Sequence, residues 1–497
     1  MLHRLTVRKG DATLRFTINA DSHWIASAIS KARTSSAVER SRAVCIAAVL
    51  FLAVAVRLVA AGEADAAPTS VTEAPLADTA TDLQEHRAEP ETAEAEPQEA
   101  NQRRGFHLYW KRGLNYGALR PVRLGDHETG IEGFLGLNGR IGLRLGVDTA
   151  GYLENGSLPE LGTQFNLRRA FIYTAGEFHL LLPILFRIDV GGVAESPYLS
   201  DTYFWLRDLR YVGTIKLGQF DAPMSLETLT GSTNQTFMEY ASPVEAFAPG
   251  LKVGAQISDH SDNGRATWAF GYFTDGQKVD VGDTSITVVR LTGRVTWLAL
   301  QPETSDDTLV HLGASASYVL SPTDRIRYSS RPESFLAPKL VDTGNLDTSD
   351  AFPFGFEFAV KRGSLTLQAE YLASKVTAGS FGNPYFDGAY GSASWFLTGE
   401  QRPYDASAGK MGPLTPIHDL DLCAGHWGAW ELAARASWLD LTDGHVRGGD
   451  MVMLTGGINW YWNRYIRILF DTSFANLYAG PNDGRIVILQ SRFQLVF

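Results

Sequence analysis

The stretch Phe352-Pro-Phe-Gly-Phe-Glu-Phe-Ala-Val360 decides the fold. Large apolar side chains occupy every second position, and proline, glycine, glutamate and alanine stand between them. Because successive side chains of a β-strand point to opposite faces, one face of this strand is wholly apolar and the other is small or charged. Residues 364–375 and 131–147 show the same alternation. The chain is therefore predicted to be all-β.

The composition of the two faces distinguishes a membrane barrel from a water-soluble sandwich, which would also alternate. The apolar faces carry Phe and Leu with hardly a charge, whereas the opposite faces carry Gly, Arg and Asp. Strands of about ten residues with this pattern are the signature of a transmembrane barrel. Aromatic residues gather at 427–430 and 460–462, as in the girdles at a membrane interface. The sequence predicts a transmembrane antiparallel β-barrel with lipid outside and water inside.

Sixteen strands are predicted, an even number as such barrels require. Their spans are 131–147, 165–175, 178–190, 203–208, 210–219, 250–259, 265–274, 286–298, 309–320, 352–361, 364–375, 386–398, 428–441, 451–462, 464–475 and 485–497. Short periplasmic turns should alternate with longer extracellular loops. Turns are predicted near Gly176, Asp208, Gly363 and Asn463, and loops at 148–164, 220–249 and 321–351. The connection 399–427 breaks this alternation, so either it hides a strand pair or one periplasmic connection is long.

The N-terminal region reads as an export signal. An apolar core at 43–56 follows Arg40 and Arg42 and leads to Ala64-Asp-Ala66. This order of basic flank, apolar core and small residues is typical of a secretory signal peptide, here cut before Ala67; a retained membrane anchor is the alternative. Residues 62–102 then hold eleven acidic residues, one arginine and no aromatic residue, a composition typical of disorder.

The predicted organisation thus has three parts. Residues 1–66 form an N-terminal extension with the signal peptide, 67–104 an acidic disordered linker, and 105–497 the barrel. An exported barrel of this kind is predicted to lie in the bacterial outer membrane, where lipid contacts its outer face.

The overall composition excludes several classes of protein. The net charge of -11 argues against nucleic-acid binding, and two cysteines allow no disulfide framework. Only one apolar stretch resembles a membrane helix, so a polytopic helical membrane protein is excluded. The mean hydropathy of -0.10 hides the membrane character, because alternation averages the two faces. Residues 103–497 remain acidic, with 41 carboxylates against 34 Lys and Arg.

Several motifs resemble the phosphate-selective porin O and P family. They are Leu217-Gly-Gln-Phe-Asp-Ala-Pro-Met-Ser-Leu-Glu227, Thr236-Phe-Met-Glu239, Ala246-Phe-Ala-Pro-Gly250, Gly428-Ala-Trp-Glu-Leu-Ala-Ala-Arg435 and Ile458-Asn-Trp-Tyr461. The resemblance covers about 130–497. It implies a sixteen-stranded, usually trimeric barrel that passes small anions such as phosphate, through a pore narrowed by the third extracellular loop. The strand count places 220–249 at that third loop.

The final strand carries a second resemblance. Phe493, Leu495 and Phe497 share a face and end the chain on an aromatic residue. This pattern is similar to the outer-membrane assembly signal of bacterial porins, which implies the barrel-assembly machinery as a partner. An ordinary last strand is the alternative.

Selectivity in a pore is set by its charged groups and its width. The alternation predicts these water-facing cations as pore-lining candidates: Arg140, Arg144, Arg187, Lys216, Lys252, Arg290, Arg294, Lys361, Arg435, Arg467 and Arg492. Either they form a track that attracts anions, or each pairs with a carboxylate such as Asp148, Asp189 or Glu357 and braces the wall.

The constriction loop departs from the family pattern at three positions. The family usually has a cation after Gly-Gln-Phe, Phe-Met-Glu and Ala-Pro-Gly, where this chain has Asp221, Tyr240 and Leu251. The constriction candidates are Asp221, Glu227, Glu239, Tyr240 and Glu245. The loss of three cations predicts a porin with weak anion preference at most.

Other functions have little support in the sequence. Neither a Gly-x-Ser-x-Gly elbow nor a phosphate-binding loop is present, so an enzyme is not expected. The residues His418, Asp419, Asp421, Cys423 and His426 fit no standard metal spacing, and neither metal nor cofactor is predicted. The alternative function is a structural or receptor-type barrel without a conducting pore.

Overall fold

A computed structural model of the chain describes residues 3–9, 12–18, 105–110, 114–124, 131–179, 183–192, 198–275, 288–301, 308–323, 325–478, 480 and 482–497. The chain forms two compact units, Met1–Gln84 and Glu85–Phe497. In the first unit, β1 (His3–Lys9) pairs antiparallel with β2 (Ala12–Ile18). The predicted signal-peptide core and the acidic linker lie outside the described residues.

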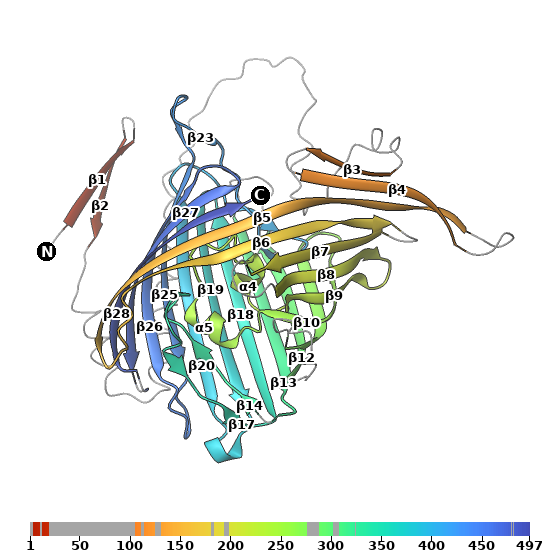
Figure 1. Cartoon of the computed structure of the whole chain (residues 1–497). Helices are drawn as coiled ribbons and strands as arrows, with labels where there is room; N and C mark the ends of the chain where they lie inside the picture. The colour runs from red at the N-terminus through yellow and green to blue at the C-terminus, as the bar shows by residue number, and fades with distance from the viewer. Residues whose placement is uncertain are drawn as a thin grey trace. The chain divides into compact units, whose positions relative to one another are not determined.

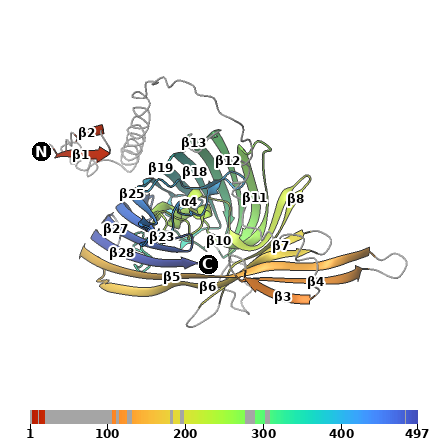
Figure 2. The same ribbon diagram turned by 90° about the horizontal axis from the view of Figure 1, so that it is seen from above.

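The second unit is a closed antiparallel barrel of sixteen strands, as predicted (Figures 1 and 2). Its strands are β5 (Ile131–Gly156), β6 (Thr163–His179), β7 (Pro183–Gly191), β8 (Tyr198–Leu209), β9 (Gly213–Asp221), β10 (Leu251–His260), β11 (Ala266–Thr274), β12 (Val289–Leu300), β13 (Leu309–Leu320), β18 (Asp350–Arg362), β19 (Leu365–Val376), β20 (Tyr385–Phe396), β25 (Ala429–Asp440), β26 (Asp450–Tyr461), β27 (Ile466–Tyr478) and β28 (Gly484–Val496). The last strand pairs with the first, from Gly484 opposite Gly156 to Val496 opposite Arg144.

The first barrel strand also carries a small additional sheet. β5 is 26 residues long, and only its second part pairs with β28. Its first part pairs with β4 (Leu114–Leu124), which in turn pairs with β3 (Gly105–Trp110). In Figure 1 this ribbon extends away from the barrel wall.

The two faces of the wall differ as the alternation predicts. Phe356 is 56% exposed on the outside, whereas its neighbour Glu357 is 4% exposed on the inside. Other large apolar side chains, such as Val295, Leu454 and Phe474, are more than half exposed on the outside. Trp430 and Trp460 stack with ring centroids 5.0 Å apart near strand ends. An apolar outer face with a polar inner face is the arrangement that lipid requires.

Two predictions about connections were wrong. Gly176 is not in a turn but inside β6, where a Cβ atom would lie 2.1 Å from the carbonyl oxygen of Asn138. Glycine is needed there for the close approach of β5. The predicted loop 148–164 is mostly strand, because β5 stays paired with β28 as far as Gly156.

The connection 399–427 does not hide a pair of wall strands. It runs from 397 to 428, and the amide of Leu397 donates to the carbonyl of Trp430 while Leu420 donates to Trp462. It therefore lies at the end of the barrel where the β26–β27 turn lies. It is one long connection at the barrel end that carries this short turn.

Three connections send residues into the lumen, and we name them by their residues. The constriction segment (222–250) contains α4 (Leu226–Thr230) and α5 (Ser242–Phe247), which Figure 1 shows within the barrel. The loop segment (321–349) carries β14 (Arg325–Ile326), β15 (Ser329–Ser330), β16 (Val341–Asp342) and β17 (Leu346–Asp347). The turn-end segment (397–428) carries β21 (Tyr404–Asp405), β22 (Lys410–Met411), β23 (Leu420–Asp421) and β24 (His426–Trp427).

The apolar core of the protein lies inside the barrel, where the inserted segments meet. Phe247 of the constriction segment contacts Tyr328 of the loop segment with ring centroids 5.3 Å apart, and Tyr328 contacts Phe386 of the wall. Met224 and Val244 belong to the same buried cluster. Within the described part of the chain, no helix has the length and apolarity to span a membrane.

Candidate functional site

The constriction segment leaves the wall at the end of β9 and returns at β10. The amide of Ala222 donates to the carbonyl of Gly250 at 3.0 Å and closes its base. Its first helix docks on the wall through Glu370 of β19, whose carboxylate accepts the amides of Leu226 at 3.0 Å and Glu227 at 2.8 Å. A carboxylate is favourable there, because the first amides of a helix lack partners within it.

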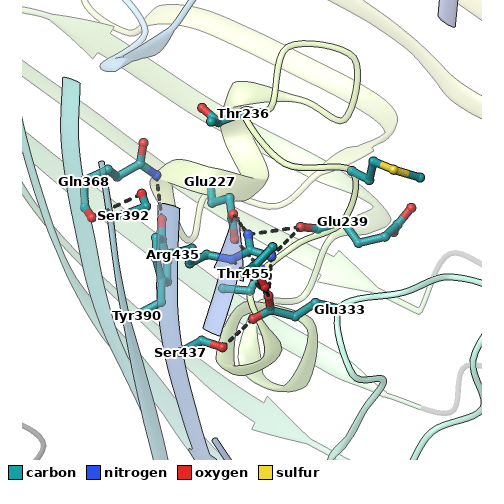
Figure 3. Close-up of polar contacts among 12 residues, drawn as sticks. Glu227, Thr236, Glu239, Glu333, Gln368, Tyr390, Ser392, Arg435, Ser437 and Thr455 are labelled. Atoms are coloured by element: carbon teal, nitrogen blue, oxygen red, sulfur yellow. Dashed lines mark hydrogen bonds and ion pairs between the residues drawn. The ribbon is translucent and has the colours of Figure 1, made fainter. Parts of the chain in front are cut away.

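Arg435 of β25 is the central anchor of the segment (Figure 3). Its guanidinium is buried and donates to Glu227 at 2.9 Å and to the main-chain carbonyl of Glu239 at 3.1 Å. It also donates to Glu333 of the loop segment at 2.6 Å. One side chain of the wall thus holds two inserted segments together.

Glu333 is itself fully engaged. Its carboxylate accepts hydrogen bonds from Thr455 at 3.0 Å, from the amide of Ser242 at 3.2 Å and from the hydroxyl of Ser437. Its backbone has a φ of 49°, which is uncommon for a residue other than glycine. This strained position is maintained by the polar contacts of its side chain.

Arg492 of β28 is a second anchor. It forms a two-pronged ion pair with Asp148 at 2.7 Å and donates to Glu239 at 2.6 Å and to the carbonyl of Met238 at 2.7 Å. Arg168 of β6 also approaches Glu239, at 3.4 Å. The carboxylate of Glu239 therefore lies between two cations.

The turn-end segment contacts the constriction segment from the other side. Arg402 donates to the carbonyl of Asn234 at 2.9 Å and pairs with the buried Glu431. Arg294 of the wall donates to the carbonyl of Gly409 at 2.8 Å and pairs with Glu357 at 2.6 Å. The polar lumen thus holds three segments through a few buried ion pairs.

The predicted cations fall into groups. Arg294, Arg435, Arg467 and Arg492 contact the inserted segments, Arg467 through the carbonyl of Thr236 at 3.1 Å. Arg144 and Arg187 pair with Asp189, and Arg140 lies over the ring of Tyr173. Lys252 and Arg290 share Asp275, Lys216 lies over the ring of Tyr203 at 3.6 Å, and Lys361 is partly buried. Asp148, Asp189 and Glu357 thus have arginine partners, as in the bracing alternative.

The constriction candidates occupy different places. Glu227 and Glu239 contact the anchors, and Glu245 pairs with Arg331 of the loop segment at 2.7 Å. Tyr240 packs against the buried apolar cluster, where burial raises its pKa. Asp221 is partly exposed at the end of β9.

Sequence reasoning missed Glu333, Glu370, Arg402 and Glu431. Glu370 and Glu431 stand on polar faces that alternation identifies, and Glu431 is four residues before Arg435 in the same motif. Glu333 and Arg402 lie in connections without periodicity, and no local pattern indicates them.

Two carboxylates of the constriction segment have opposite pKa shifts. Burial raises the pKa of Glu227 to about 7, although Arg435 opposes the shift. Burial would also raise the pKa of Glu239, but Arg168 and Arg492 outweigh it and lower the pKa to about 2. The guanidinium of Arg435 is shared by two carboxylates, whereas the carboxylate of Glu239 lies beside two guanidinium groups.

The two shifts predict opposite effects of pH on stability. Because the pKa of Glu227 in the folded protein exceeds that of an exposed glutamate, its contribution favours folding below about pH 4.5 and is lost as pH rises to about 7. The contribution of Glu239 is present above about pH 4.5 and is lost as pH falls toward 2. Each effect is on the order of 3 kcal/mol. Thermal unfolding in detergent at several pH values checks this.

Two matched variants assign the effects. Glu227→Gln should flatten the pH dependence between about pH 5 and 7 and leave the acid limb unchanged. Glu239→Gln should do the reverse. A Glu227→Gln protein with an unaltered dependence above pH 5 would contradict the assignment.

The region 418–426 carries two histidines, two aspartates and a cysteine. His418 and His426 stack ring on ring with centroids 4.3 Å apart, and Asp421 accepts the amides of Cys423 and Ala424. Over the described residues, no group of three His, Cys, Asp or Glu side chains is placed to hold a metal ion.

The last strand ends at the seam of the barrel. Phe493 is 36% exposed on the outer face, and the amide of Phe497 donates to Leu143 of β5 at 2.8 Å. The carbonyl of Phe497 accepts the amide of Leu143 at 3.0 Å and the hydroxyl of Tyr173 at 3.0 Å. The terminal residue therefore extends the closing ladder.

Comparison with known proteins agrees with this architecture. Residues 140–484 match the family described as phosphate-selective porin O and P. The chain is 28% identical over 381 residues to an uncharacterised protein of Caulobacter vibrioides, with 72% of this chain and 73% of that protein covered. It is 24% identical over 363 residues to Porin O of Pseudomonas aeruginosa, with 64% of this chain and 77% of that protein covered.

Solved structures of porins are more distant. The anion-selective porin from Comamonas acidovorans is 11% identical, with a TM-score of 0.44 and coverage of 73% of this chain and 100% of that one. OmpT of Vibrio cholerae, as expressed in the outer membrane, is 9% identical, with a TM-score of 0.43 and coverage of 72% and 98%. The family match spans more than half of the chain.

Proposed function

Because the chain belongs to the phosphate-selective porin O and P family, we propose that this outer-membrane channel admits small hydrophilic solutes by passive diffusion, with only a weak preference for anions. The observation that carries the proposal is the constriction segment, an insertion held in the lumen by Arg435 and Arg492. A chain inserted in this way narrows a water-filled barrel, and the charges along it act on passing ions.

The weak preference follows from how the lumenal cations are used. Arg294, Arg435 and Arg492 each bond a buried carboxylate, so their charges are largely compensated. Asp221 adds a carboxylate where the family usually has a cation. We propose that these features leave little net positive potential in the pore.

Reversal potentials across a KCl gradient test the selectivity. The purified protein in a planar bilayer should give a reversal potential close to zero, on the anion side. Asp221→Lys should move it toward the chloride potential, because a cation replaces an anion in the lumen. Asp262→Asn, in the exposed β10–β11 turn, is the matched control and should not move it. A wild-type potential near that of pure chloride selectivity would contradict the proposal.

A barrel that does not conduct is the second candidate. The apolar contacts among Phe247, Tyr328 and Phe386 inside the lumen favour it, because such a cluster excludes water. The same bilayer measurement decides, since a sealed barrel gives no current steps.

We further propose a homotrimer that the barrel-assembly machinery inserts after export directed by residues 1–66. The family, the apolar signal core and the terminal aromatic strand support these expectations. We also propose that the pore-lining and constriction candidates predicted from the sequence act in this same channel.

A further inference from the structure

A cavity of about 390 Å³ lies inside the barrel, between the wall strands β8 to β11 and the turn-end segment. It is lined by side chains of the constriction segment as well, including Leu229. Its volume falls in the range of small-molecule sites, about 300–1,000 Å³. The lining residues Lys216, Asp221 and Lys410 are all partly exposed, so solvent reaches them.

One wall of the cavity is aromatic. Tyr203 and Trp205 of β8 pack with ring centroids 5.1 Å apart and an interplanar angle of 51°. Pro223 and Leu229 add apolar surface from the constriction segment. An apolar wall of this kind covers the carbon skeleton of an organic solute, which inorganic phosphate lacks.

The cavity also presents charges of both signs that are not paired with each other. Lys216, Lys410 and Asp221 lie close enough for their charges to interact, yet none forms an ion pair within the described chain. The other inner charges have partners: Asp405 accepts the hydroxyl and amide of Ser407, and Arg294 holds Glu357.

The remaining charged residues that line the cavity lie near the C-terminal ends of strands β8 and β10. They are Arg207, Asp208, Asp259 and His260. The ammonium and carboxylate groups line one cavity without contacting each other. They therefore leave space for a solute whose own anionic and cationic groups pair with them.

We propose that this cavity binds a zwitterionic solute of the amino-acid type. Its carboxylate pairs with Lys216 and Lys410, its ammonium pairs with Asp221, and its apolar side chain lies against Trp205. The cavity thus selects one class of solute for the channel. The physiological use of that binding rests on the proposed function. The binding itself does not depend on conduction.

Calorimetric titration of the full-length protein in detergent tests the site. The probes are phenylalanine, 3-phenylpropionate (no ammonium), 2-phenylethylamine (no carboxylate) and inorganic phosphate. Phenylalanine should bind about tenfold or more tightly than each of the other three, because each missing charge removes one charge-assisted contact.

Two charge-removing variants assign the contacts. Asp221→Asn should weaken phenylalanine binding about tenfold and should not weaken 3-phenylpropionate binding, which also shows that the cavity is intact. Lys216→Gln should weaken the binding of phenylalanine and 3-phenylpropionate and should not weaken the binding of 2-phenylethylamine. The matched controls Asp262→Asn and Lys375→Gln, exposed and outside the cavity, should bind as the wild type does.

The proposal is overturned if phosphate or 3-phenylpropionate binds as tightly as phenylalanine, if Asp221→Asn has no effect, or if none of the probes binds. Binding of phenylalanine by a protein that forms no current steps would sustain the site and refute the proposed channel function. Current steps without binding would do the opposite.

Discussion

Arg435→Gln is expected to release the constriction and to raise the single-channel conductance severalfold. The variant leaves the buried carboxylates of Glu227 and Glu333 without a cation and frees the carbonyl of Glu239. Breaking a buried ion pair from one side costs about 3–5 kcal/mol. The cost falls on the contacts between the inserted segments and not on the wall ladder. Bilayer recordings should therefore show larger and noisier steps.

Controls separate the loss of the anchor from a general loss of folding. Arg447→Gln removes an exposed arginine from the β25–β26 loop and should leave the conductance unchanged. Arg435→Lys keeps the charge but not the fork of donors, and should lie between the wild type and Arg435→Gln. An Arg435→Gln channel with wild-type steps would show that Arg435 does not hold the segment.

A double variant examines the physical cause. Glu333→Gln in the Arg435→Gln background removes one of the two uncompensated charges. It should therefore recover part of the thermal stability that Arg435→Gln loses. If the double variant instead loses as much thermal stability as the two single variants together, the guanidinium of Arg435 stabilises the lumen by packing and not by charge.

The strands were predictable because their signal is local. The side chains of Phe352 to Val360 alternate along a single strand, and lipid outside and water inside make the two faces differ in every strand. Each of the sixteen predicted spans overlaps a barrel strand. The strand count and the family motifs together predict that 220–249 is the inserted loop.

What was missed depends on contacts distant in sequence. Nothing near Gly176 tells a turn from a strand, because the reason for glycine is the close backbone of Asn138 in the neighbouring strand. The strand beyond 148 is maintained by pairing with β28, more than 300 residues away. Likewise, Glu333 belongs to the site only because its carboxylate pairs with Arg435, which is distant in sequence.

The long connection 399–427 illustrates the same limit. Its length violates the alternation of turns and loops, and the sequence leaves two explanations open. The structure resolves them through Arg402 and Arg294, whose guanidinium groups hold the segment inside the barrel. Both contacts join residues more than 100 positions apart.

The central claim is that the constriction segment lies in the path of the ions, and a cysteine at Leu229 tests it most directly. Leu229 belongs to α4 and lines the large cavity of the lumen. In a Cys423→Ser background, Leu229→Cys should react with a charged, water-soluble thiosulfonate reagent during a bilayer recording. The attached group should then abolish most of the current, because it stands in the narrowed lumen.

Phe356→Cys on the lipid-facing side of β18 is the matched control, and its current should be unaffected by the reagent. The measurement is the current through each variant before and after the reagent is added. Block at position 229 with no block at position 356 is the predicted result. An unchanged current through a Leu229→Cys channel that mass spectrometry shows to be modified would contradict the account.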